Sequence, residues 1–132
     1  MKTLILFAHT FWENSKVNKA LLESVQGLPN LTIENLTLTC PNATIDVNAQ
    51  KSLLKDADTI IFQFPLFWFS TPSLLKEWQD RVFEGIIEQS GRDHIIMSNP
   101  QTGEWYLVLM IYLDFVTFEE PINYKKQYYL QQ

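Results

Sequence analysis

Apolar and polar positions change spacing repeatedly along the first ninety residues, and these changes predict alternating strands and helices. A continuous apolar run of strand length occupies 4–8, which is typical of a strand buried on both faces of a parallel sheet. Residues 59–64 are rich in β-branched and aromatic side chains, which are enriched in strands. Apolar residues alternate less regularly over 31–38 and predict another strand, interrupted by a bulge or bend. The last of the three runs is expected to end at Pro65.

Apolar residues recur at helical spacing after each of these runs. The first helix is predicted to be capped by Ser15 and to stop at Gly27, since serine favours the N-cap and glycine the C-terminal end. Asp46 can cap a second, short helix. The third is predicted over 71–89, because Pro72 at the first helical position loses no hydrogen bond.

Three strand–helix units in a row predict an α/β fold with a doubly wound parallel sheet. Crossovers in such sheets are right-handed, so a reversal of strand order leaves a crevice at the carboxyl ends of two neighbouring strands. With the reversal between the first and third strands, the loops 9–15 and 65–71 border that crevice. These loops are therefore the candidate binding loops.

The loop 9–15 leads into the first helix, whose free N–H groups and positive dipole end favour phosphate. Ser15 and Asn18 lie three residues apart and can share one side of the first turn. Lys16 adds a positive charge, and His9 a possible donor. A helix cap with incidental polar neighbours is the alternative interpretation of this loop.

The second loop contains three consecutive aromatic residues, Phe67, Trp68 and Phe69. Aromatic rings in a solvent-facing loop are costly unless they pack on a partner or a planar ligand. The alternative interpretation is that these aromatic residues belong to the core or to a dimer contact. A phosphate site and an aromatic wall at one crevice together indicate flavin mononucleotide better than either feature alone.

Several segments resemble the flavodoxin-like NAD(P)H:quinone oxidoreductases. They are Phe7-Ala8-His9, Ser15-Lys16-Val17-Asn18-Lys19-Ala20-Leu21, Ala57-Asp58-Thr59-Ile60-Ile61-Phe62-Gln63-Phe64-Pro65-Leu66-Phe67-Trp68-Phe69, and then Pro72, Leu74-Leu75-Lys76, Trp78 and Asp80-Arg81-Val82-Phe83. The pieces follow family order and spacing over residues 2–84. They are most similar to the small bacterial branch of general-stress oxidoreductases and ancillary flavoproteins of potassium-efflux systems.

The resemblance implies a flavodoxin-like fold with FMN as cofactor, FAD being the alternative, and NAD(P)H as co-substrate. Ping-pong hydride transfer would deliver the electrons to a quinone, usually in a homodimer. The residues implied in holding the phosphate and ribityl chain are His9, Ser15, Lys16, Val17 and Asn18. Those implied in lining the flavin ring are Pro65, Leu66, Phe67, Trp68 and Phe69. No catalytic acid can be carried over, because the family's proton-relay tyrosine and histidine fall beyond the matching part.

The chain departs from the family after about residue 84. Relatives continue with a strand that ends in a Thr-Thr-Gly-Gly turn, whereas no two glycines are adjacent in this sequence. Two further strand–helix units of about 30 residues each do not fit into the residues beyond 90. We therefore expect one domain over 1–132 with a divergent end over 85–132, and hypothesise that this end is replaced or frame-shifted.

The apolar stretch 105–118 is shorter than the roughly 20 residues of a membrane span. It predicts one or two strands beside the third strand.

The amino-acid composition excludes several classes of function. A net charge of −5 without like-charge blocks argues against a nucleic-acid binder, and a single cysteine excludes an internal disulfide. No signal peptide precedes the first strand, so a cytoplasmic protein is expected. No metal site is expected: Asp114, Glu119 and Glu120 have no supporting histidine, and His94 has no partner at ligand spacing.

Two classes of function remain open from the sequence. One is an FMN-dependent NAD(P)H:quinone oxidoreductase, or a weakened descendant of one. The other is a non-catalytic flavodoxin-like binding or regulatory module, for example an ancillary subunit docked on a potassium-efflux membrane protein. A gene remnant whose aromatic end supports a dimer is a third.

Overall fold

A four-stranded parallel sheet forms the centre of the computed structural model, which describes residues 1–84, 87–90, 94–97, 99, 101–102, 104 and 106–114. The strand order is β2-β1-β3-β6, and every neighbouring pair is parallel. The strands are β1 (Thr3–Phe7), β2 (Leu31–Asn35), β3 (Thr59–Leu66) and β6 (Leu107–Asp114). This order confirms the doubly wound sheet, with the reversal between β1 and β3.

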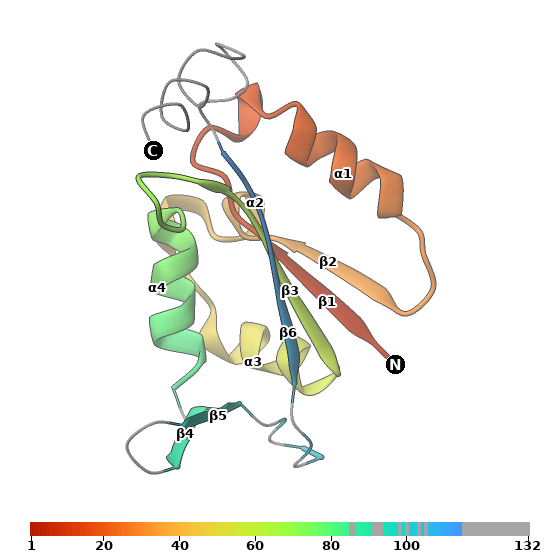
Figure 1. Ribbon diagram of the computed structural model, residues 1–132, viewed down its shortest axis with the longest axis vertical. Helices are drawn as coiled ribbons and strands as arrows, with labels where there is room; N and C mark the ends of the chain where they lie inside the picture. Colours follow the sequence, from red (N-terminus) through yellow and green to blue (C-terminus); the bar gives the residue numbers. More distant parts are fainter. Residues whose placement is uncertain are drawn as a thin grey trace, which may run out of the picture.

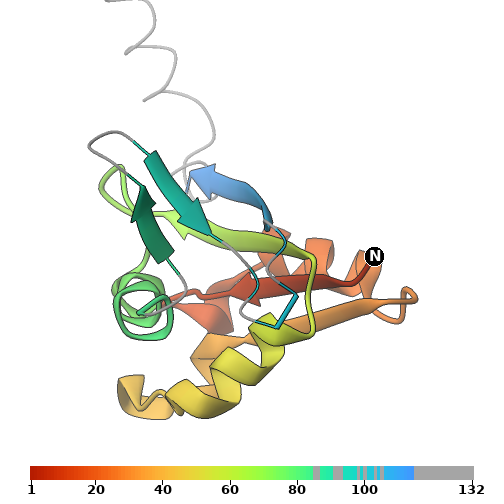
Figure 2. The same ribbon diagram turned by 90° about the horizontal axis from the view of Figure 1, so that it is seen from below.

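Helices cover both faces of the sheet (Figure 1). One face carries α1 (Val17–Val25); the other carries α2 (Leu36–Thr39), α3 (Val47–Lys55) and α4 (Ser73–Val82). Figure 2, turned by 90°, shows the same two layers of helix around the sheet. A separate antiparallel hairpin of β4 (Ile87–Ser90) and β5 (His94–Met97) follows α4. No helix among the described residues has the length and apolar character that crossing a membrane requires.

Alternating strand residues divide the core into two clusters. On the α2/α3/α4 side, Leu4 and Leu6 of β1 and Phe62 of β3 pack against Trp78 of α4. The Phe62 and Trp78 rings meet edge to face, with centroids 5.9 Å apart. On the α1 side, the cluster is smaller and centres on Phe7 and two further buried residues, Ile5 and Leu22. The centre of the sheet is thus buried on both faces, which explains why β1 is a continuous apolar run and β3 is mostly apolar.

The last strand is held beside β3 by polar anchors that precede it in the chain. The Asn99 amide nitrogen donates to the carbonyl oxygens of Lys55 and Ala57, at 2.9 and 3.1 Å. The Tyr106 hydroxyl donates to the Leu54 carbonyl at 2.6 Å, and burial, followed by the nearby Asp58, raises the pKa of Tyr106 to about 12. These contacts tie the segment before β6 to the end of α3. The expectation of a strand within 105–118 beside the third is confirmed for Leu107–Asp114, and the residues from 115 onward lie outside the described part.

Four local expectations need correction. Ser15 does not cap α1: Lys16 occupies the N-cap position, and no side chain caps that end. Residues 36–38 belong to α2 rather than to an interrupted strand, because the chain turns inward at the fully buried Leu36. The strand β3 continues past Pro65 to Leu66. The third helix ends at Val82 rather than near Gln89, because the β4–β5 hairpin follows it.

Candidate functional site

The two candidate loops meet at the carboxyl ends of β1 and β3. These strands are neighbours in register, with Phe7 opposite Gln63, so the loops that follow them leave the same edge of the sheet. The Phe67 ring meets the His9 ring edge to face at 6.2 Å between centroids, and the Phe11 ring at 6.1 Å. The predicted convergence of the loops 9–15 and 65–71 is therefore present in the structure.

His9 is buried and held from two sides. Its main-chain N–H donates to the Thr37 hydroxyl oxygen at 2.9 Å, and that hydroxyl donates to the His9 carbonyl at 3.2 Å. The Phe11 N–H donates to His9 Nδ1 at 3.0 Å. Burial, and secondarily the charge of Lys19, lowers the pKa of His9 below its ordinary 6.5. With Nδ1 serving as an acceptor, the neutral ring carries its proton on Nε2.

The start of α1 is electropositive and contains an unsatisfied hydroxyl. Ser15 is 7 % exposed, and its Oγ has no hydrogen-bond partner among the residues that the structure describes. The first N–H groups of α1 have no acceptor within the helix, and the first turn contains no acidic residue. Lys16 and Lys19 place two positive charges at an end where the helix dipole is already positive. This combination destabilises the isolated helix end and favours an anion.

Asn18 links this helix start to β3. The side chain is 2 % exposed, and its Oδ1 accepts a hydrogen bond from Gln63 Nε2 at 3.1 Å. The same Gln63 nitrogen reaches the Asn18 main-chain oxygen at 3.3 Å. The first turn of α1 is consequently fixed to the carboxyl-terminal half of β3.

The aromatic loop is a tight hairpin with a strained backbone. Phe67 and Ser70 exchange two main-chain hydrogen bonds, each of 2.9 Å, around a two-residue turn. Both turn residues have positive φ, 47° at Trp68 and 63° at Phe69, as in a type I′ turn, where asparagine and glycine are usual. Their side chains are 94 % and 87 % exposed. Two large aromatic residues thus occupy a conformation that costs energy and gains them no burial within the described structure.

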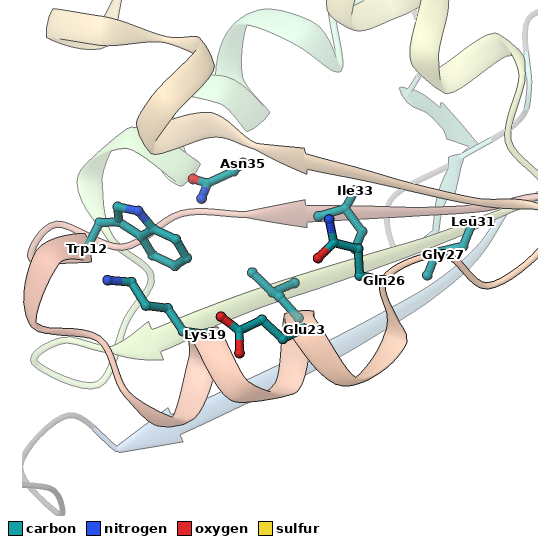
Figure 3. Close-up of a pocket in the computed structure, with 9 residues that line it drawn as sticks. Trp12, Lys19, Glu23, Gln26, Gly27, Leu31, Ile33 and Asn35 are labelled. Atoms are coloured by element: carbon teal, nitrogen blue, oxygen red, sulfur yellow. The ribbon is translucent and has the colours of Figure 1, made fainter.

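A cavity lies elsewhere, between α1 and β2 (Figure 3). It measures about 620 Å³. Trp12 lies at one end and Gly27 at the other, with Lys19 and Glu23 of α1 facing Ile33 and Asn35 of β2. None of the ten predicted flavin-site residues lines it. Its wall comes from the flank of α1, the edge strand β2 and Trp12 of the loop 9–15, whereas no residue of the loop 65–71 lines it.

The ten predicted site residues lie on the two loops and the start of α1, and they differ in burial. Buried members are His9, Ser15, Asn18 and Pro65; partly buried members are Val17, Leu66 and Phe67; exposed members are Lys16, Trp68 and Phe69. Sequence reasoning missed Thr37 and Gln63. Gln63 could have been found, because it is the only amide within the apolar run of β3; nothing in the sequence singles out Thr37.

Comparison with known proteins agrees with this architecture. The family model described as flavodoxin-like fold (Flavodoxin_2) matches residues 1–92, more than half of the chain. The chain therefore belongs to this flavodoxin-like family. A second family model, for spore coat proteins (Spore_GerQ), matches residues 67–124, less than half of the chain. The two matches overlap in the segment that contains the aromatic loop and α4.

Among curated relatives, the chain is 46 % identical over 81 residues to the glutathione-regulated potassium-efflux system ancillary protein KefG of Cronobacter sakazakii, covering 61 % of this chain and 44 % of the relative. It is 42 % identical over 82 residues to the uncharacterized NAD(P)H oxidoreductase YrkL of Bacillus subtilis, covering 62 % and 47 %. The chain thus spans less than half the length of these relatives. Among solved structures, general stress protein 14 of Treponema denticola in complex with FMN is 30 % identical, with a TM-score of 0.67 over 85 % of this chain and 61 % of that one.

Proposed function

We propose that this chain binds FMN at the junction of the loops 9–15 and 65–71 and acts as an NAD(P)H:quinone oxidoreductase or a weakened descendant of one. The observation that carries the proposal is the buried Ser15 hydroxyl at the electropositive start of α1, which has no partner within the described part of the chain. An unsatisfied buried hydroxyl is costly, and a phosphate oxygen would satisfy it. The FMN complex of a 30 % identical solved structure supports the choice of cofactor.

The residues present fit the phosphate and ribityl end of a flavin. Ser15 Oγ and the first N–H groups of α1 would donate to the phosphate, Lys16 would contribute charge, and Val17 would lie at the same turn. His9 would donate from Nε2, since its Nδ1 already accepts from the Phe11 N–H. Asn18 completes this group of donors. One anion site at one helix start matches the single phosphate of FMN, so FMN is the proposed cofactor. FAD remains the alternative.

The residues of the second loop fit the ring end. Pro65 and Leu66 would contact the ring largely through backbone groups, and Phe67 is positioned by its ring contacts with the other loop. The exposed Trp68 and Phe69 would gain burial against a planar ligand. A bound flavin supplies hydride acceptance from NAD(P)H and hydride donation to a quinone. The protein's part is to bind, orient and desolvate.

The proposal also covers the cellular location and the oligomeric state of the protein. We place the protein in the cytoplasm as a homodimer. The end over 85–132 is proposed to be a replaced or frame-shifted segment on a single domain, and the separate spore-coat model match over 67–124 supports replacement.

A second candidate function is a flavodoxin-like regulatory module that docks on a potassium-efflux membrane protein without turnover. It is favoured by the relative named as an ancillary protein of such a system.

Flavin titration and turnover separate the two candidate functions. The enzyme is expected to quench FMN fluorescence on binding, to lose its yellow colour with NAD(P)H and to regain it with a quinone. Flavin uptake without turnover favours the module, and no uptake contradicts the flavin proposal in either form.

Ser15→Ala tests the observation that carries the proposal. Removing the hydroxyl should raise the Kd for FMN by roughly 10-fold or more, because hydrogen bonds to charged groups are strong, and should leave riboflavin binding unchanged. In the flavin-free protein the same variant should be as stable as the wild type, or more stable by about 1 kcal/mol. Ser24→Ala is the control, since that hydroxyl donates to the Leu21 carbonyl on the exposed part of α1. Equal effects of both variants on FMN would place the phosphate elsewhere.

A further inference from the structure

Gln63 is the polar side chain that joins β3 to the start of α1. It is buried, at 4 % exposure, on the face of the sheet that α1 covers. Its Nε2 donates to two acceptors of one residue, Asn18 Oδ1 and the Asn18 main-chain oxygen, at 3.1 and 3.3 Å. A buried amide in an apolar strand needs such partners, yet an apolar residue of similar volume would fill the same space without a polar cost.

The hydrogen bonds fix which end of the Asn18 side chain faces β3. An asparagine amide has an acceptor oxygen and a donor NH₂ group on opposite sides of its terminal carbon. Because Gln63 presents an NH₂ group, the side of Asn18 that faces it must be the oxygen. The Asn18 NH₂ group is thereby directed away from β3 as a donor, and the amide cannot rotate without setting two NH₂ groups against each other.

We propose that Gln63 is a positioning residue for phosphate recognition: it holds the Asn18 amide with its NH₂ group available to an anion at the start of α1. The inference rests on the proposed FMN function and adds a residue to it. An amide free to rotate would present an oxygen to the phosphate in part of the population, and an oxygen facing a phosphate oxygen is repulsive. The direction of one buried hydrogen bond on β3 therefore determines whether Asn18 attracts or repels the ligand.

The test compares FMN with riboflavin, which lacks the phosphate. Gln63→Met keeps the side-chain volume and removes both hydrogen bonds to Asn18. It is expected to raise the Kd for FMN about 10-fold while changing the Kd for riboflavin less than 2-fold. Thr59→Val is the matched control: Thr59 is also buried on β3, at the other end of the strand, and no described residue bonds to its Oγ1. The control should leave the FMN-to-riboflavin ratio of Kd values unchanged.

A double-mutant cycle shows whether Gln63 acts through Asn18. In an Asn18→Ala background, Gln63→Met should change the FMN-to-riboflavin ratio no further, because the amide that it orients is absent. Additive effects would mean that Gln63 acts on the ligand by another route, which overturns the inference. Equal weakening of FMN and riboflavin by Gln63→Met would show a merely structural role and also overturns it.

Asn18→Asp keeps the inference testable if Gln63→Met fails to fold. A carboxylate still accepts the hydrogen bond that Gln63 donates to Asn18 Oδ1, and the bond to the main-chain oxygen is unchanged, but the NH₂ donor is replaced by an oxygen. This variant should lose at least 10-fold in FMN affinity while riboflavin binding persists; undiminished FMN binding overturns the assigned orientation. Wild-type protein that binds neither flavin contradicts the proposed function itself, whereas wild-type FMN binding that Gln63→Met leaves intact contradicts only the role of Gln63.

Discussion

His9 shows how burial and one hydrogen bond set the chemical state of a side chain. Its Nδ1 accepts from the Phe11 N–H, and Thr37 bonds to both its main-chain N–H and its carbonyl. Protonation of the ring would place a second N–H against the Phe11 donor in a desolvated position. The lowered pKa of His9 follows from that burial and, secondarily, from Lys19. At neutral pH the residue is therefore a neutral donor through Nε2 rather than a cation.

The same lowered pKa predicts a dependence of stability on pH. Below about pH 6.5 the unfolded chain takes up a proton on this imidazole that the folded chain resists, so the free energy of unfolding falls on acidification. The loss occurs between 6.5 and the lower pKa of the folded state. His9→Asn, whose oxygen can still accept from the Phe11 N–H, should lose less stability than the wild type between pH 7 and pH 5 in urea unfolding. A His94→Asn variant that behaves identically would show that the burial of His9 is not the cause.

At the scale of an element, the hairpin turn after β3 combines strain with exposed aromatic surface. Left-handed backbone costs a non-glycine residue about 1–2 kcal/mol, and Phe69 adopts it at φ 63°. Strain of this kind persists where surrounding structure imposes it and is often found at ligand-binding sites. Here, two mutual hydrogen bonds between Phe67 and Ser70 close the turn.

Two substitutions at Phe69 separate the backbone strain from the aromatic ring. Phe69→Ala removes the ring and keeps the strain, whereas Phe69→Gly removes both. The glycine variant should exceed the alanine variant in free energy of unfolding by about 1 kcal/mol, measured by urea denaturation without flavin. Both should weaken FMN binding to a similar extent, because both lose the ring. Equal stability of the two variants would show that the turn does not hold this conformation in solution.

The elements that local chemistry determines were predictable, and those that depend on tertiary contacts were not. The N-cap at Asp46 is confirmed, since its side chain accepts from the Ala49 N–H at 3.1 Å. Ser15 has the same capping propensity, but its hydroxyl is buried and bonds to none of the described residues. Capping propensity describes the hydrogen bond that a side chain makes to the N–H groups of its own helix. It carries no information on Gln63, which lies 45 positions from Asn18 in sequence.

The meeting of the two candidate loops was also predictable, whereas the contacts that support them were not. The pattern of strands placed the loops 9–15 and 65–71 at one edge, and the ring contact between His9 and Phe67 confirms that they meet. The support beneath the loops was not foreseen, because the Thr37 contact with His9 depends on how α2 follows β2. Long-range partners of this kind leave no local periodicity in the sequence.

At the scale of the whole molecule, β6 forms an apolar edge of the sheet. The described part of the chain places β6 at an edge, where it pairs with β3 alone. The strand is apolar from Leu107 to Leu113. Its large side chains are exposed on both faces, Leu109 at 45 % and Met110 at 56 %. Natural edge strands usually carry charges, prolines or bulges that prevent pairing with another chain, and this strand has its only charge at its last residue, Asp114.

The β6 edge therefore predicts self-association of the protein. Antiparallel pairing of β6 with β6 of a second copy is self-complementary, because a two-fold axis places identical N–H and carbonyl groups opposite each other. Light scattering should give a mass above 15.5 kDa that rises with concentration. Leu109→Lys should shift the protein to monomer, since lysines brought close together across the two-fold axis repel each other. Leu38→Lys, at an exposed leucine of α2 away from this edge, adds the same charge and should leave the mass unchanged. A wild-type protein that remains at 15.5 kDa at high concentration would show that the edge is protected in solution.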